Sequence, residues 1–155
     1  MAREERAVEF ELGLVWDTGA PRPTLHRRAG ELVLTFRLAD GQPPTGVGRV
    51  EFFGVCAEKF GEPNDERLPE HALYGRGLHY YGAHEVVHSR WVATERASSR
   101  EKLRHFIFCF KDSTFECLAT SYRATAVPST TAASLDVRPV PPTLRQRLRQ
   151  RLRRR

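Results

Sequence analysis

The sequence predicts a mainly β protein. We expect a single antiparallel domain of about six strands, curled as a barrel or a sandwich, with a basic C-terminal tail that is disordered or forms a short helix. Several segments alternate apolar and polar residues with period two, which is the pattern of a half-buried strand. The ten prolines and eleven glycines favour turns over long helices, and residues 105–122 have the pattern of a hairpin. A ferredoxin-like or other α+β fold is the alternative.

The hairpin is the clearest element of the sequence. Its first strand places three aromatic side chains on one face, those of Phe106, Phe108 and Phe110. Its second strand continues this apolar face with Phe115, Cys117 and Ala119. Asp112 and Ser113 carry turn chemistry, and a two-residue turn centred on them would pair Phe110 with Phe115. Because a lone hairpin is marginal in water, this apolar face needs a partner layer from the rest of the chain.

Upstream of the hairpin, alternation predicts strands at 9–16, 31–38 and 49–56. The second of these puts four side chains on one face, those of Leu32, Leu34, Phe36 and Leu38. The third is apolar on both sides, so we expect it to be a central strand. Segments rich in Gly and Pro, 17–28 and 40–48, are expected to be loops.

Residues 60–78 are polar and broken by Gly and Pro, and they predict a long loop with a short helical turn near Asp65. Loops of this length are often functional or mobile. Tyr80–Thr94 alternates again and predicts a further strand.

One motif, HEVVH, would have catalytic meaning on a helix. There His84 and His88 would lie on one face and bind zinc, and Glu85 would activate water, which describes a zinc-dependent hydrolase. A third ligand, such as Glu95 or Glu101, would be required.

The residues around the motif favour a strand instead, because GLHYYGA before it and SRWVAT after it contain poor helix formers. On a strand His84 and His88 would be about 13 Å apart, too far to share one zinc ion. We therefore expect no catalytic residue, no metal site and no cofactor, with zinc and Glu85 kept as the alternative.

The candidate ligand-binding residues are Asp65, Glu66, His71, Tyr81 and Asp112. Oxygen-rich loops can hold Ca²⁺ or Mg²⁺, but the EF-hand spacing is absent, and the Pro63-Asn64-Asp65 stretch is an ordinary turn signal. Tyr81 could stack on a ligand. Asp112 and Glu116 could form a carboxylate pair, but we expect Asp112 to shape the turn and Glu116 to face solvent.

The positive charge is concentrated at the C-terminus. Of 25 basic residues, eight arginines lie in residues 137–155 with no acid beside them, which leaves 17 basic against 19 acidic residues, a net charge of −2, in residues 1–136. We expect a globular domain over 1–126, a Pro/Ser/Thr linker over 127–142 and an arginine-rich tail over 143–155 that becomes helical when it binds. Nucleic acid, an acidic protein or an anionic membrane would suit this tail.

The arginines expected to contact an anionic partner are Arg145, Arg147, Arg149, Arg151 and Arg153. Leu144, Leu148 and Leu152 recur every fourth residue and would share one helical face.

Three cysteines with no metal-type spacing are expected to be free thiols in a reducing cytoplasm. A disulfide between Cys109 and Cys117 stays open, since a hairpin loop with three central residues would let them face each other. The charged first ten residues do not resemble a signal peptide, and no apolar run is long enough to cross a membrane, so a cytoplasmic location is expected.

Two blocks, KFGEPNDERLPEHALYGRGL (59–78) and HFIFCFKDSTFECLA (105–119), resemble a small group of uncharacterised bacterial proteins that share FGxPNDE and FxDSTFE. The similarity spans about half of the chain, roughly Phe52 to Tyr122. It implies a shared domain, a strand between the two blocks and a role for the PNDE loop, but no activity.

The sequence thus supports three classes of function. The first is a non-enzymatic domain that binds a protein or a small ligand through the long loop and the hairpin end. The alternatives are the zinc hydrolase and a nucleic-acid-associated protein that acts through its tail.

Overall fold

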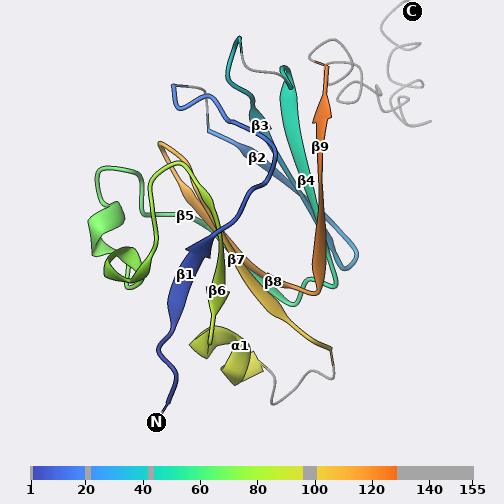
Figure 1. Ribbon diagram of the computed structural model, residues 1–155. Coiled ribbons are helices and arrows are strands. Elements are labelled where there is room, and N and C mark those ends of the chain that lie inside the picture. Colours follow the sequence, from blue (N-terminus) through green and yellow to red (C-terminus); the bar gives the residue numbers. More distant parts are fainter. Residues whose placement is uncertain (1, 20–21, 42–43, 96–100, 129–155) are drawn as a thin grey trace, which may run out of the picture.

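The computed structural model describes residues 2–19, 22–41, 44–95 and 101–128. Within these residues, nine strands form two antiparallel sheets, which confirms the mainly β prediction (Figure 1). None of the helices in the described part of the chain has the length and apolar character needed to cross a bilayer.

The larger sheet has the strand order β1-β6-β7-β8-β5. Its strands are β1 (Arg6–Glu9), β6 (Ala83–Val87), β7 (Arg104–Cys109), β8 (Thr114–Ala119) and β5 (Ala57–Gly61). The smaller sheet has the order β2-β3-β4-β9. Its strands are β2 (Thr24–Arg28), β3 (Glu31–Arg37), β4 (Val47–Phe53) and β9 (Ser121–Val127).

Several element predictions were wrong in their limits. Of the predicted strand 9–16, only Glu9 is in a strand, because β1 ends there. The chain then passes to the smaller sheet, where Trp16 forms an isolated β-bridge with Leu38. The predicted loop 17–28 contains β2, and the predicted strand Tyr80–Thr94 is β6 followed by the short helix α1 (Arg90–Glu95). In the predicted long loop, Leu68–Glu70 (η1) and Tyr74–Arg76 (η2) form short 3-10 helices.

The main core lies between the two sheets. The inward face of β3 is the predicted one, because Leu32, Leu34 and Phe36 are buried in this core, as is Leu38 directly after the strand. Phe52 of β4 reaches across to three rings of the hairpin, with centroid separations of 5.7 Å to Phe106, 5.6 Å to Phe108 and 5.3 Å to Phe115. These tilted and edge-to-face contacts add specificity to the burial of apolar area.

The hairpin of β7 and β8 is present with its predicted apolar face, but its register differs. The backbone N–H of Phe110 donates to the carbonyl of Ser113, so the turn is centred on Lys111 and Asp112, one residue earlier than expected. Phe108 therefore faces Phe115. A slip of the turn by one residue moves each partner by two positions, and so it leaves every side chain on its predicted face.

The other face of the hairpin is buried as well, under a third layer. Loop residues Leu68, Leu73 and Leu78 pack against Ile107 of β7. A second small cluster joins α1 to β8 through Val92, Leu103 and Leu118. In Figure 1 the two 3-10 helices lie beside the larger sheet, on the side away from the smaller sheet. As a result every residue of β8 is buried.

The chain passes from one sheet to the other at two neighbouring corners. Gly54, with φ +58°, follows β4, and Thr120 alone separates β8 from β9. The amide and the hydroxyl of Thr120 donate to the carbonyl of Phe53 at 2.9 and 3.0 Å. Strands that switch sheets through such bends make the corners of a sandwich.

The cysteines are free, and the two in the hairpin are buried on opposite faces. Cys117 belongs to the core between the sheets, whereas Cys109 belongs to the cluster under the loop. The disulfide left open by the sequence is therefore excluded, because Cys109 is opposite Thr114 and Cys117 is opposite Phe106, and the two side chains point to opposite faces of the sheet.

Replacing Gly77 should destabilise the fold by about 2 kcal/mol or more. Gly77 ends η2 with φ +95°, and a Cβ there would overlap the carbonyl oxygen of Ala7 in β1. The control is Gly75→Ala in the same 3-10 helix, where a Cβ meets nothing within 4 Å, and its effect should stay within about 0.5 kcal/mol. Urea denaturation of both variants measures the difference, and equal stabilities would contradict the proposed clash.

Candidate functional site

The first four HEVVH residues lie on β6, as predicted, whereas the flank SRWVAT, which was expected to be extended, forms α1. His84 is a fully buried residue of β6, and its Nε2 accepts a hydrogen bond from the backbone N–H of His79 at 3.1 Å. Burial lowers the pKa of His84. His88 follows the strand, is exposed and has φ +55°. The helix that a zinc site on these two histidines requires is not formed.

Glu85, the base of the zinc alternative, is held by an arginine. Arg104 of the neighbouring strand donates to both carboxylate oxygens, at 2.9 and 2.7 Å, in a bidentate pair. Across the described part of the chain, no group of three or more His, Cys, Asp and Glu side chains is placed to hold a metal ion.

The most highly organised polar group lies on the outer face of β7 and β8, beneath the third layer. Glu116 is only 8% exposed, although the sequence predicted a solvent-facing side chain. Its Oε1 lies 2.8 Å from Nε2 of His71 and 3.9 Å from Nε2 of His105, and its Oε2 lies 4.0 Å from Nζ of Lys59. Ser89, at the start of α1, lies 2.9 Å from Nδ1 of His105.

The hydrogen bonds determine where the ring proton of His71 sits. Its Nδ1 accepts from the backbone N–H of Leu73 at 3.1 Å, so the neutral ring carries its proton on Nε2 and donates it to Glu116. A metal ion bound to Nε2 would need that proton to be absent. The arrangement is therefore that of a hydrogen-bonded carboxylate and not that of a metal ligand.

The same reasoning applies to His105. The Ser89 hydroxyl already accepts the backbone N–H of Val92 at 3.1 Å, so its proton is available for Nδ1 of His105. The second ring nitrogen of His105 is buried 3.9 Å from Glu116, beyond hydrogen-bond distance. Two imidazole rings and an ammonium group thus lie around one buried carboxylate, and His71 is the ring that is hydrogen-bonded to it.

These contacts shift two pKa values. Burial alone raises the pKa of Glu116, but the hydrogen bond from His71, together with the electrostatic interactions with the two imidazoles and with Lys59, outweighs burial and lowers it. Burial lowers the pKa of His105 to about 4 in spite of the nearby carboxylates of Glu116 and Glu5. At neutral pH the group therefore holds an ionised Glu116 and a neutral His105.

This polar group joins η1 and α1 to the three strands β5, β7 and β8, and its members are Lys59, His71, Ser89, His105 and Glu116. His71 caps η1 and Ser89 precedes α1, so the carboxylate ties both covering segments to the sheet. Only His71 of this group was among the sequence-predicted site residues. A usable signal was present, because His105 and Glu116 interrupt the second apolar face of the hairpin, formed by Ile107 and Leu118.

A second, exposed site brings three of the other predicted residues together. The hydroxyl of Tyr81 donates to Oδ2 of Asp65 at 2.6 Å, and this bond raises the pKa of Tyr81 to about 12. The backbone N–H of Asp65 donates to the carbonyl of Lys111 in the hairpin turn at 2.8 Å. Asp112 follows in that turn, close enough for its charge to act on Tyr81.

Tyr81 belongs to an exposed group of aromatic side chains. Tyr74, Tyr80 and Tyr81 are 38%, 41% and 37% exposed. Their rings are neighbours, with centroid separations of 5.9 Å between Tyr74 and Tyr80 and 6.3 Å between Tyr80 and Tyr81. Together with Asp65 and Asp112 they form what we call the tyrosine surface.

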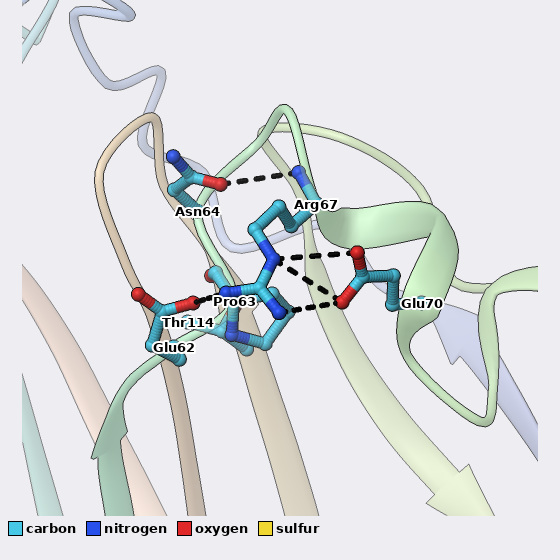
Figure 2. A network of polar contacts seen from close by, with 6 residues as sticks. All are labelled: Glu62, Pro63, Asn64, Arg67, Glu70 and Thr114. Carbon is cyan, nitrogen blue, oxygen red and sulfur yellow. Dashed lines mark hydrogen bonds and ion pairs between the residues drawn. The ribbon is translucent and has the colours of Figure 1, made fainter.

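A network around Arg67 holds the loop that carries Asp65 (Figure 2). Its guanidinium donates to Glu70 and to Glu62, and its backbone N–H donates to the side-chain oxygen of Asn64 at 3.1 Å. The hydroxyl of Thr114 in β8 donates to the carbonyl of Pro63 at 2.7 Å. The loop is thus fixed to the hairpin by side-chain contacts.

The remaining predicted residues do not join the tyrosine surface. Glu66 is exposed on the same loop, and His71 points to Glu116 instead. The tail arginines lie outside the described residues, namely Arg145, Arg147, Arg149, Arg151 and Arg153. Protein-family models, curated proteins and solved structures gave no match to this chain.

His105 should make stability depend on pH in the acid range. Its folded pKa of about 4 lies below the usual 6.5, so the unfolded chain binds more protons between these values. The contribution of His105 to the free energy of unfolding is therefore fully present above pH 6.5 and is lost as the pH drops toward 4. At pH 5 the loss relative to pH 7 should be about 2 kcal/mol. Urea denaturation at pH 7 and pH 5 measures this loss. His84 acts with the same sign, so His105→Gln should reduce the loss without abolishing it. An equal loss in His105→Gln and the native chain would contradict the assignment.

Glu116→Gln should destabilise the fold by about 2 kcal/mol at pH 7, because a neutral amide forms a weaker hydrogen bond with the imidazole of His71 and leaves buried groups poorly paired. The control is Glu66→Gln, the same change at an exposed position, which should stay within about 0.5 kcal/mol. Thermal or urea denaturation compares them. If both variants match the native chain, the buried carboxylate does not stabilise the covering layer.

Proposed function

We propose that this chain is a non-enzymatic binding domain whose tyrosine surface holds a cationic group of a protein partner or of a small ligand. The observation that carries the proposal is the 2.6 Å hydrogen bond between Tyr81 and Asp65 at the junction of the long loop and the hairpin turn. It joins an aromatic ring to a carboxylate at the place where the sequence predicted ligand contacts.

Backbone conformation supports a functional role for Tyr81. Its φ of +53° lies in the left-handed region, which is costly for a bulky side chain. Residues in such conformations concentrate at binding and catalytic sites, where the surrounding structure maintains them. Here the bond to Asp65 fixes the hydroxyl, and the ring is left accessible.

The chemistry of the surface favours a positive charge. The faces of tyrosine rings attract ammonium and guanidinium groups, and tyrosine is enriched at protein interfaces. Asp65 and Asp112 add two carboxylates beside the rings. On its other side Asp112 lines a small cavity with Lys111, Arg22 and Arg37. Exposed contacts of this kind give modest affinity, which fits a reversible partner.

The arginine-rich tail is proposed as a separate contact for anionic partners such as nucleic acid or an acidic surface. This part of the proposal rests on the sequence, in which eight arginines follow a body of net charge −2. We place the protein in the reducing cytoplasm, as its free cysteines favour.

The tyrosine surface should bind a fluorescent hexa-arginine peptide. Fluorescence anisotropy would be measured with the full chain and with a variant in which the eight arginines from Arg138 onward are Gln, which removes competition from the tail. Asp112→Asn and Tyr80→Ala should each weaken binding by about two- to fivefold, because each removes one exposed electrostatic contact.

The matched control is Asp40→Asn, a second exposed aspartate in a turn, which should bind as the native chain does. Hexa-glutamate should not bind. If Asp112→Asn and Tyr80→Ala behave like Asp40→Asn in both backgrounds, the tyrosine surface is not the binding site.

A further inference from the structure

An open groove of about 270 Å³ lies next to Tyr81, between residues 9–18 and Tyr81–Ala83. Its lining includes two carboxylates and several apolar side chains, namely Glu9, Glu11, Leu12, Leu14, Trp16 and Tyr81. The groove therefore continues the tyrosine surface with a more apolar floor.

Fixed points at both ends hold the wall of this groove in place. The backbone N–H of Phe10 donates to the carbonyl of Ala83 at 3.0 Å, and that of Asp17 donates to the carbonyl of Arg37 at 2.9 Å. Between these points Leu12 and Leu14 pack against the core. Val15 is 53% exposed, and its carbonyl accepts from the backbone N–H of Ala39 at 2.8 Å.

The charge and size of the groove indicate what it binds. Glu9 and Glu11 are exposed, and no Lys or Arg occurs among its described lining residues. Its volume lies below the roughly 300–1,000 Å³ that is typical of small-molecule pockets. Such an open, acidic and partly apolar groove suits a peptide that combines apolar anchors with basic residues.

The chain contains a peptide of this composition. We propose that residues 143–155 (TLRQRLRQRLRRR) of the same chain dock in this groove, with leucines on its apolar floor and arginines beside Glu9 and Glu11. This inference rests on the proposed function, since it names a cationic partner for the same face of the molecule. The segment combines leucines at every fourth position with arginines, and the groove combines apolar side chains with two carboxylates.

The described chain ends close enough for this contact. Val127 at the end of β9 pairs with Val47 at the start of β4. Gly46, the residue before Val47, accepts a hydrogen bond from the backbone N–H of Leu38. Leu38 in turn forms a β-bridge with Trp16, which lines the groove. The last described strand and the groove are thus at the same end of the smaller sheet. Residues 129–142 can extend over about 46 Å, from 3.3 Å per residue.

The test places the photo-crosslinker p-benzoylphenylalanine at Gln150 of the full chain, which leaves every leucine and arginine of the segment intact. After irradiation, mass spectrometry should find crosslinks to residues 9–18 or Tyr81–Ala83 within one chain. Glu11→Lys should lower their yield at least fivefold, because it reverses a charge in the groove.

The matched control is Glu31→Lys at the opposite end of β3, which should leave the yield unchanged. A mixture of isotopically labelled and unlabelled chains separates contacts within a chain from contacts between copies. Crosslinks to other regions, crosslinks only between copies, no crosslinks, or equal yields in Glu11→Lys and Glu31→Lys would each overturn the proposal.

The two proposals fail separately. Hexa-arginine binding that depends on Asp112, with crosslinks elsewhere, would overturn docking of the segment and retain the cation-binding surface. The opposite result is also possible: crosslinks form in the groove, but the variant with Gln in place of the tail arginines does not bind hexa-arginine. That result would retain docking of the segment and overturn the proposed function.

Discussion

The β7–β8 hairpin is buried on both faces, and the other parts of the fold are arranged to satisfy that constraint. One face is covered by the smaller sheet, and the other by the long loop and α1. Because the second face includes Glu116, its cover must bring hydrogen-bond donors as well as apolar side chains. His71 and Ser89 fulfil this requirement, so a polar contact decides how the loop is seated.

The parts of the fold with strong period-two patterns were predictable. The prediction of which side chains of β3 and of the hairpin point into the core was confirmed, since alternation specifies the two faces of a strand even when the turn is displaced. The edge strand β2, with the sequence TLHRR, is too polar to show this pattern. The segment after Glu9 alternates without being a strand, because its side chains alternate over the core while its backbone leaves the sheet. The six-residue helix α1 is too short to show a helical period.

The site was predictable where it depends on turns and exposed residues, and less so where it depends on burial. Asp65, Tyr81 and Asp112 were identified from local chemistry, and the fold brings them together. The partner of His71 was missed because Glu116 is one charged residue in a strand, a position that is usually solvated. Only the third layer, which has no periodic signal in the sequence, converts it into a buried carboxylate.

The two hairpin cysteines offer separate reporters of the two interfaces. Cys109 is shielded by the loop, and Cys117 is shielded by the opposing sheet. Burial raises the pKa of both thiols, so neither reacts while its cover is closed. The alkylation rate of Cys109 therefore measures lifting of the loop, and that of Cys117 measures separation of the sheets. One chain without added labels can thus rank which layer opens first.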